Sequence, residues 1–223
     1  MSHADDVRRA SAAAIESLDL TPVAAAAEAL ARALGEGDGL LHVLGCGHSQ
    51  AIALEGYHRA GAPAWVAPVL DPQLSPTRGA SGIEAERMPG LGTALVDRLP
   101  RAARALLVVS TSGRNAVSVE AAKAARDRGM LTIAITARSP VNRLAAASYH
   151  VLDTAVPEGD ASIDVAGERM APLSTVAAAV LLHCLLAETE ARLGGGAVLS
   201  SVNVDGGEAR NAGHVARYPH LRP

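Results

Sequence analysis

Five short apolar segments, each followed by a turn and most by a helical pattern, constrain the fold of this 223-residue chain more than any other feature. The segments are apolar at nearly every position, which is typical of strands covered on both faces. Strands that alternate with helices indicate a doubly wound α/β fold with a five-stranded parallel sheet. We predict strands at 40–44, 64–68, 103–110, 130–136 and 148–153, and helices at 4–17, 22–34, 49–60, 116–128 and about 174–193.

The composition agrees with such a fold and excludes several classes of protein. Apolar residues make up 49% of the chain but aromatic residues only 2%, so alanine, valine and leucine must build the core. The net charge of −3 provides no overall basic field for nucleic acid. The two cysteines, Cys46 and Cys184, are too few for a disulfide framework or a four-ligand zinc site. A reducing cytosol is therefore the expected compartment.

The start of the chain and its apolar segments predict a cytoplasmic protein. The first ten residues, MSHADDVRRA, lack the apolar region of a signal peptide. The helical segment 174–193 is the most apolar, but charged residues such as Glu188 and Arg192 interrupt it. We therefore expect no span of a bilayer and no membrane partner.

We predict three regions along the chain. Residues 1–36 form a helical pair that packs on the domain or on a dimer partner, residues 37–195 form the α/β domain, and residues 196–223 form an irregular tail over the site. Residues 70–92 contain three prolines and four glycines, which predicts a long loop. Long loops in compact domains are often functional.

The first strand ends in the turn Gly45-Cys46-Gly47-His48-Ser49, which precedes a helix. Glycines permit positive φ and close backbone approach, and a helix N-terminus favours an anion. A dinucleotide fingerprint would need a small residue where Gln50 stands, and no acidic residue closes the next strand. A phosphate-binding Gly-Lys-Ser/Thr sequence is absent too. The turn is thus either an anion site or only a tight corner.

The central strand is followed by Ser110-Thr111-Ser112-Gly113-Arg114-Asn115. Hydroxyls and backbone N–H groups can surround the three oxygens of a phosphate without a metal. One residue would suffice to cap a helix, so three successive hydroxyls favour a phosphate site over a plain capped turn. Ligands of doubly wound sheets bind beyond the carboxyl ends of the strands, where the strand order switches, so this turn and the first one are expected to meet there.

A third polar segment, Pro172-Leu173-Ser174-Thr175, opens the long final helix. Taken alone, Ser174 or Thr175 is an adequate N-cap.

Taken together, GCGHS, STSGRN and APLST resemble the SIS (sugar isomerase) domain, a phosphosugar-binding fold with flavodoxin-like layering. The resemblance extends from about Leu40 to Leu193, and the same order of segments occurs in proteins similar to arabinose-5-phosphate isomerase. The chain lacks the His-Gly-Asp and His-Pro-Gly-Gly sequences of those isomerases. Its PEGDAS and SSVNVDGGEARN segments resemble an uncharacterised bacterial SIS family that carries a sugar-isomerase label.

The resemblance implies which residues bind the substrate. Ser110, Ser112 and Asn115 match the phosphate-binding residues of the family's second loop, and Thr111 between them can offer its N–H. Ser49 matches a first-loop serine that contacts the sugar or its phosphate. SIS domains usually pair with their sites at the interface, so we expect a homodimer or higher homo-oligomer. The other candidates for substrate binding are Gly47, His48, Ser174, Thr175, Asn203 and Asp205.

Isomerisation of an aldose to a ketose needs a base near carbons 1 and 2, and carboxylates and histidines are its natural agents. Glu55 and His58, on the helix after the first turn, and Glu84, in the long loop, are the catalytic candidates. Glu86, Asp160 and Asp205 stay open as alternatives, whereas His183 in the final helix is expected to be a core or interface histidine. No cluster with zinc-ligand spacing occurs, so we expect neither metal nor cofactor.

We therefore predict a phosphosugar-binding protein that acts as a cofactor-independent aldose–ketose sugar phosphate isomerase. Two alternatives stay open: a sensor that binds a sugar phosphate without turnover, and a sugar-phosphate lyase or etherase that uses a glutamate as acid and base. The segment before Leu40 is too short for a helix-turn-helix head, which favours an enzyme over a regulator and predicts no nucleic-acid partner.

Overall fold

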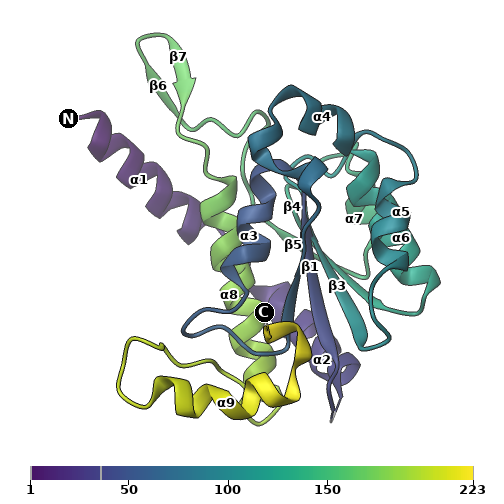
Figure 1. Ribbon diagram of the computed structural model, residues 1–223. Helices are drawn as coiled ribbons and strands as arrows, with labels where there is room; N and C mark the ends of the chain where they lie inside the picture. Colours follow the sequence, from purple (N-terminus) through teal and green to yellow (C-terminus); the bar gives the residue numbers. More distant parts are fainter. Residues whose placement is uncertain (1, 36, 223) are drawn as a thin grey trace.

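A five-stranded parallel sheet forms the centre of the computed structural model, which describes residues 2–35 and 37–222 (Figure 1). The strand order is β2-β1-β3-β4-β5, so the chain leaves β1 toward one edge and later returns to build the other. This order places a crevice beyond the carboxyl ends of β1 and β3. The predicted doubly wound fold is confirmed, with strands β1 (Leu40–Gly45), β2 (Val66–Val69), β3 (Ala103–Val109), β4 (Leu131–Thr136) and β5 (His150–Asp153).

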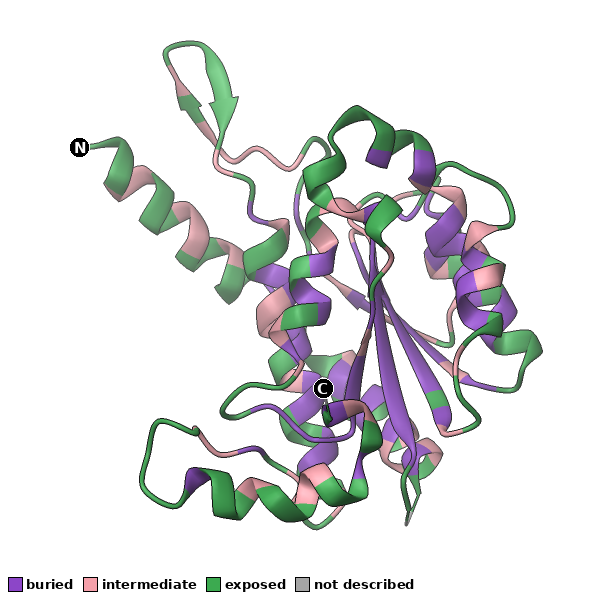
Figure 2. Cartoon of the chain, in the orientation of Figure 1, coloured by how far each residue is buried: buried purple, intermediate pink, exposed green. Residues whose placement is uncertain are grey.

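Helices cover both faces of the sheet. Alternate residues of β3 divide between two cores: Leu107 belongs to one apolar cluster and Leu106 to the other. The first cluster includes α2 (Thr21–Leu34), α3 (Gln50–Glu55) and α8 (Ser174–Arg192), and the second includes α5 (Leu91–Asp97), α6 (Ala116–Asp127) and α7 (Arg143–Ala147). Figure 2 shows the strands buried along most of their length, as near-continuous apolar segments require.

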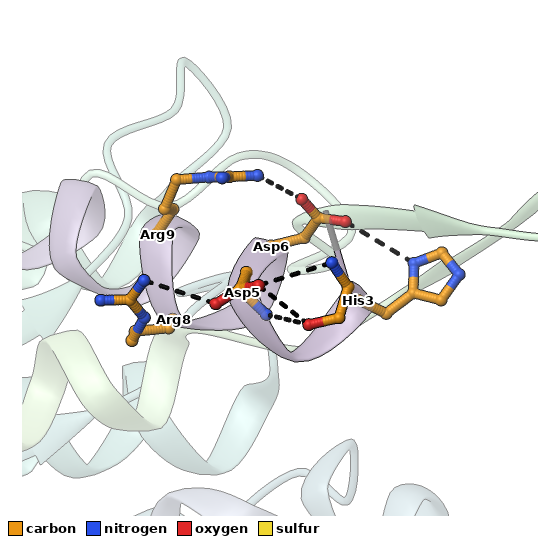
Figure 3. A network of polar contacts seen from close by, with 6 residues as sticks. His3, Asp5, Asp6, Arg8 and Arg9 are labelled. Carbon is orange, nitrogen blue, oxygen red and sulfur yellow. Dashed lines mark hydrogen bonds and ion pairs between the residues drawn. The ribbon is translucent and has the colours of Figure 1, made fainter.

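Two segments extend from this body, helix α1 (His3–Glu16) and a hairpin of β6 (Ile163–Val165) and β7 (Glu168–Met170) (Figure 1). Every residue of α1 is described and none is buried. Ser2 and Asp5 form a capping box, and Asp6 accepts hydrogen bonds or ion pairs from His3 and Arg9 (Figure 3). Such pairs contribute about 0.2–0.5 kcal/mol each. Local contacts therefore help to stabilise α1, and Ala10 and Ala14 pack against the core cluster, whereas α2 lies within the domain core.

Helix α8 is, within the described part of the chain, the one helix long and apolar enough to cross a membrane. From the sequence we expected its charged residues to exclude a membrane span, but by length and composition the helix still qualifies as one. Leu181, Leu182 and Leu185 are nevertheless buried in the core that α8 shares with α2 and α3. The helix is thus apolar because it packs inside the domain.

The long loop and one helix differ from the prediction. The helix predicted at 49–60 is preceded by the 3₁₀ helix η1 (Gly47–Ser49) and ends at Glu55, with Gly56 as its C-cap. The positive φ of 45° at His58 is not compatible with continuation of the helix to residue 60. Residues 70–92 are not one loop: they contain the 3₁₀ helices η2 (Pro72–Leu74) and η3 (Pro76–Arg78), the helix α4 (Ala80–Glu86) and the start of α5. Asp71 and Ser75 cap the two 3₁₀ helices with their side chains.

The C-terminal tail was predicted to be irregular and to lie over the site, and both expectations are wrong. It forms α9 (Gly207–Arg217) and the 3₁₀ helix η4 (Pro219–Leu221). Arg217 pairs with Asp38 just before β1, at 3.0 Å, and His220 Nε2 lies 3.0 Å from the carbonyl oxygen of Val66 at the start of β2. These contacts hold the tail at the amino ends of the strands, opposite the crevice (Figure 1).

Candidate functional site

The turn after β1 folds tightly because two glycines allow it. A Cβ added to Gly45 would lie 2.2 Å from the carbonyl oxygen of Ser49, so only glycine fits there. Gly47 adopts a positive φ of 54°, which side chains disfavour. The backbone turns through η1 into α3 and leaves His48 exposed and Ser49 half-buried at the crevice. The three predicted first-loop residues, Gly47, His48 and Ser49, thus lie at the switch in strand order.

The loop after β3 is held from below by the end of β4. Gly113 has a φ of 59°, and an added Cβ would lie 2.0 Å from Oδ1 of Asn142. Asn142 is buried and donates from Nδ2 to Oγ1 of Thr136 at 2.7 Å. Thr136 in turn donates to the carbonyl oxygen of Ser110 at 2.6 Å. This chain of contacts fixes the loop backbone before any ligand arrives.

The hydroxyl groups of the second loop lie above that support. Ser110 Oγ accepts a hydrogen bond from the Gly113 amide at 3.3 Å, and Ser112 Oγ accepts one from the Arg114 amide at 3.4 Å. Ser110 and Thr111 are half-buried, whereas Ser112 is exposed. Hydroxyls that accept long bonds from their own loop keep their protons available for an external acceptor.

A recess between the loops gathers hydroxyl groups from four segments. Ile52, Val109, Ile135 and Ala178 form its apolar wall. It encloses about 10 Å³, which is room for about one water molecule. The structure thus brings together four of the predicted residues and adds Thr154, which follows β5: Ser49, Thr111, Thr154, Ser174 and Thr175.

Thr154 is a residue that the sequence reasoning missed. Its Oγ1 is buried and has no hydrogen-bond partner within the described part of the chain. The rule that found the first two loops, a polar residue directly after a parallel strand, applies to Thr154 as well. That signal was present in the sequence and was not used.

Asp160 has a structural role at the start of α8. Its Oδ1 accepts hydrogen bonds from the amides of Leu173 at 2.9 Å and Ser174 at 2.8 Å, and the Ser174 hydroxyl donates to its Oδ2. The predicted N-cap at Ser174 or Thr175 is therefore wrong, because Leu173 occupies the cap position and the Asp160 carboxylate supplies the acceptor. Asp160 positions Ser174 at the recess.

Glu86, at the end of α4, brings a carboxylate to the crevice between the first and second loops. Its Oε2 accepts a hydrogen bond from Asn115 Nδ2 at 2.6 Å, and a Cβ placed on Gly47 would lie 2.9 Å from its Oε1. Burial raises the pKa of Glu86, and the bond from Asn115 opposes that rise. Glu84, two residues earlier on the helix, is exposed. Of the acidic candidates on α4, Glu86 lies at the crevice and the predicted Glu84 does not.

The Cys46 thiol in the first loop is not a nucleophile. Burial, followed by the nearby Glu86 charge, raises its pKa to about 12. Cys46 therefore stays protonated at neutral pH and fills space in the turn.

Glu55 and His183 form a second polar group on the neighbouring seam between α3 and α8. Glu55 Oε1 lies 3.0 Å from His183 Nε2 and also accepts from Arg59 at 2.5 Å. The hydrogen bond with His183 is the largest cause of the lowered pKa of Glu55; burial opposes it, and the charge of Arg59 adds to the lowering. Both side chains are partly exposed. His183 was expected to be a core or interface residue, but its contact is with a catalytic candidate.

The pair lies along the same two helices that supply the recess. Glu55 is six residues beyond Ser49, and His183 is eight beyond Thr175, which corresponds to about 9 and 12 Å along a helix. The seam between α3 and α8 therefore runs from the hydroxyl-lined recess to the Glu55–His183 pair.

Three predicted site residues lie elsewhere. His58 is exposed in the turn after α3, beside tail residues such as Val202. Asn203 and Asp205 are exposed in the connection that precedes α9. The tail pairs through Ala197 and Leu199 with the segment before β2, which keeps this connection at the far end of the sheet. Long-range pairing therefore decided positions that the local sequence did not reveal.

Metal ligands do not gather in the described ranges 2–35 and 37–222, where no group of three or more His, Cys, Asp or Glu side chains is placed to hold an ion.

Comparisons with known proteins place these features in context. The family model described as "SIS domain" matches residues 3–137. A UPF0309 protein of Brucella anthropi is 34% identical over 218 residues, which cover 90% of each chain. A UPF0309 protein of Brucella ovis is 34% identical over 210 residues, covering 86% of this chain and 87% of the relative.

Solved structures share the fold. A candidate phosphosugar isomerase involved in capsule formation from Bacteroides fragilis has a TM-score of 0.56 and 22% identity, covering 85% of this chain and 89% of that one. The NanR protein of Vibrio vulnificus, complexed with ManNAc-6P, has a TM-score of 0.53 and 12% identity, covering 86% and 63%. The phosphoheptose isomerase of Neisseria gonorrhoeae has a TM-score of 0.50 and 22% identity, covering 85% and 95%.

Proposed function

The chain belongs to the SIS domain family, and from that premise we propose that it is a cytoplasmic enzyme that isomerises a phosphorylated aldose and ketose without a cofactor. In this proposal the phosphate binds between the loops after β1 and β3. The sugar chain extends along the seam of α3 and α8 toward Glu55 and His183.

The second loop carries the proposal. Ser110, Thr111 and Ser112 present hydroxyl groups at the carboxyl end of the central strand, directly before the N-terminus of α6. No side chain within the described ranges caps α6, although Asn115 occupies the N-cap position. The amide groups of the first helical turn, the helix dipole and the hydroxyls together favour a dianionic phosphate ester.

The Glu55–His183 pair is the proposed catalytic group. Its carboxylate has a lowered pKa and is ionised at neutral pH, as a base must be. Glu55 takes the proton from carbon 2 of the aldose and returns it to carbon 1. His183 moves a proton between the oxygens on the same two carbons, so atoms and charge balance across the isomerisation.

A sensor that binds without turnover is the second candidate. The ion pair between Glu55 and Arg59 favours this candidate. Partly exposed ion pairs of this kind are common on protein surfaces and need no catalytic role. Binding is expected in both cases, and turnover separates them.

Thermal-shift measurements with a panel of sugar phosphates, alongside the matching free sugars, test the phosphate site. We expect stabilisation by the phosphates alone. Ser112→Ala should then weaken binding by about 1–3 kcal/mol, since a hydrogen bond to a charged group is lost. Ser201→Ala, in the tail at the far end of the sheet, is the matched control and should bind normally. Equal stabilisation by the free sugars would contradict the phosphate anchor.

NMR of the ligands that bind then tests catalysis. We expect interconversion of one aldose–ketose pair, with Glu55→Gln and His183→Asn abolishing turnover while they retain binding. Glu188→Gln, an exposed substitution on the same helix as His183, should leave turnover unchanged. Binding without interconversion in any pair would identify the sensor instead.

We also propose that the protein is a homodimer whose second copy covers α1 and its surroundings. Helix α1 extends from the body with Val7 and Ile15 exposed, and Leu54 of α3 and Val176 of α8 add apolar surface. Deleting residues 2–16 should convert the dimer to a folded monomer, because that deletion removes no buried residue. Sedimentation equilibrium measures the change, and a monomeric full-length chain would end this part of the proposal.

A further inference from the structure

The carboxylate of Glu86 bridges the same two loops that a bound phosphate would bridge. Oε2 accepts a hydrogen bond from Nδ2 of Asn115 in the second loop at 2.6 Å. Oε1 faces Gly47 of the first loop so closely that a Cβ there would lie only 2.9 Å away. An anionic group of the protein itself therefore lies in the crevice.

The contact removes Asn115 from its ordinary role. An asparagine at the N-cap normally turns its side chain back to the amides of the first helical turn. Asn115 instead directs its amide group to Glu86, and no side chain in the described ranges caps α6. The negative carboxylate is favoured beside the positive end of α6, which is the same interaction that would favour a phosphate.

The helix that carries Glu86 is lightly attached to the domain. Within α4, only Gly82 and Ala85 are buried, while Ile83 is about half exposed. Gly79, with a φ of 54°, is the N-cap of α4, and its backbone accepts large rotations at low cost. Gly90, with a φ of 85°, is the N-cap of α5, four residues beyond the end of α4. Beyond α4, the Gly90 amide donates to Glu120 of α6 at 2.8 Å, so the segment is anchored there while α4 itself can move.

We propose that Glu86 is an internal competitor that occupies the phosphate position in the free protein, and that α4 swings away when a phosphorylated sugar binds. This inference rests on the proposed phosphate site. Two negative groups repel each other in one small crevice, so the ligand phosphate and the Glu86 carboxylate exclude each other. Displacement releases Asn115 and the N-terminus of α6 to the ligand. Anions too weakly bound to displace Glu86 are thereby rejected.

Inorganic phosphate is the probe, with binding measured by calorimetry on the full chain. Glu86→Gln keeps an oxygen for Asn115 but removes the competing charge, so we expect phosphate to bind about tenfold more tightly, the change that one charge-assisted contact supports. Glu84→Gln removes a charge from the exposed face of the same helix and should leave the affinity within twofold of wild type, about the scatter expected for a surface substitution. Glu86→Asp keeps the charge on a shorter side chain and should give an intermediate affinity.

Hydrogen exchange of the unaltered protein gives an independent measurement. Phosphate should increase exchange in residues 80–86 while it decreases exchange in residues 110–118. Slower exchange in α4, or weaker or unchanged binding by Glu86→Gln, would overturn the inference although the phosphate site stands. If neither wild type nor Glu86→Gln binds phosphate or any sugar phosphate, the proposed function is wrong and the inference fails with it.

Discussion

Acid should destabilise this protein through one buried histidine in the central sheet. His42 lies in β1, three residues before the first loop, with 5% of its surface exposed. Its Nδ1 has no hydrogen-bond partner in the described part of the chain. Burial above all, with smaller effects from His220 and Arg128, lowers its pKa from 6.5 to about 4. The folded protein therefore holds His42 neutral where the unfolded chain would protonate it.

The sign and size of the effect follow from proton linkage. Above pH 6.5 neither state binds the proton, and the contribution of neutral His42 to stability is complete. As the pH falls below 6.5, His42 is protonated in the unfolded state but stays neutral in the folded state. The free energy of unfolding therefore decreases until the pH reaches about 4, where His42 is protonated in the folded state as well. The two pKa values imply a loss of about 2 kcal/mol at pH 5 and about 3 kcal/mol at pH 4.

Urea unfolding at pH 7 and pH 5 measures this loss. Trp65 is the only tryptophan in the sequence and is buried, so its fluorescence reports unfolding directly. His42→Leu replaces the ring with an apolar group of similar size, and the stability that it loses between pH 7 and pH 5 should be about 2 kcal/mol smaller than for wild type.

His3→Gln, which replaces an exposed histidine, is the control and should titrate like wild type. The pKa values of His150 and His220 are also lowered by burial, but both remain in the variant and so cancel in the comparison. Equal pH dependence in wild type and His42→Leu would refute the reasoning.

Three further substitutions test contacts that hold the site and the fold. Gly113→Ala should cost at least about 1–3 kcal/mol and abolish phosphate binding, since a Cβ would clash with Asn142 at a positive φ; urea unfolding and calorimetry measure both. Glu190→Gln should cost about 1–3 kcal/mol, because its buried carboxylate accepts from the Trp65 indole at 2.8 Å and from a backbone amide; a shift of Trp65 emission accompanies the loss. Asp160→Ala should lower stability by about 0.5–2 kcal/mol through loss of the α8 cap, and an unchanged urea midpoint would contradict that role.

The sequence predicted the sheet well because each strand carries its own signal. A run such as LLHVL is apolar on both faces, and this property is local to the run. The observed β1 and β3 each agree with the predicted ranges within one residue. Helix α4, the β6–β7 hairpin and α9 were not predicted. Helix α4 and the two hairpin strands are short, so their own sequences carry little apolar periodicity and tertiary contacts decide them. Helix α9 is amphipathic but largely polar and exposed, so it lacks the apolar segment on which the other predictions rested.

Some residues of the candidate site could likewise be predicted from the sequence, whereas others depend on tertiary packing. Ser49 and Thr111 follow strands whose carboxyl ends lie at the same edge of the sheet, so the topology alone predicts that they lie together, as they do in the recess. Nothing local distinguishes Glu84 from Glu86, because the choice depends on which side of α4 faces the loops. The pairing of Glu55 with His183 joins residues 128 positions apart, and only the packing of α3 on α8 reveals it.

The hydroxyl-lined recess between the loops is too small to bind a sugar, and this links the proposed site to the proposed dimer. The hydroxyl-lined recess has room for about one water molecule, so it can receive no more than a single phosphate oxygen, and the rest of a ligand lies outside it. In the proposed binding mode the rest of the ligand lies along the partly exposed seam at Glu55 and His183, near the apolar residues Leu54 and Val176. A second copy packed on this surface would exclude water from the seam and strengthen the electrostatic contacts there. Loss of the dimer should therefore weaken a sugar phosphate far more than inorganic phosphate, because only the sugar depends on the covered seam.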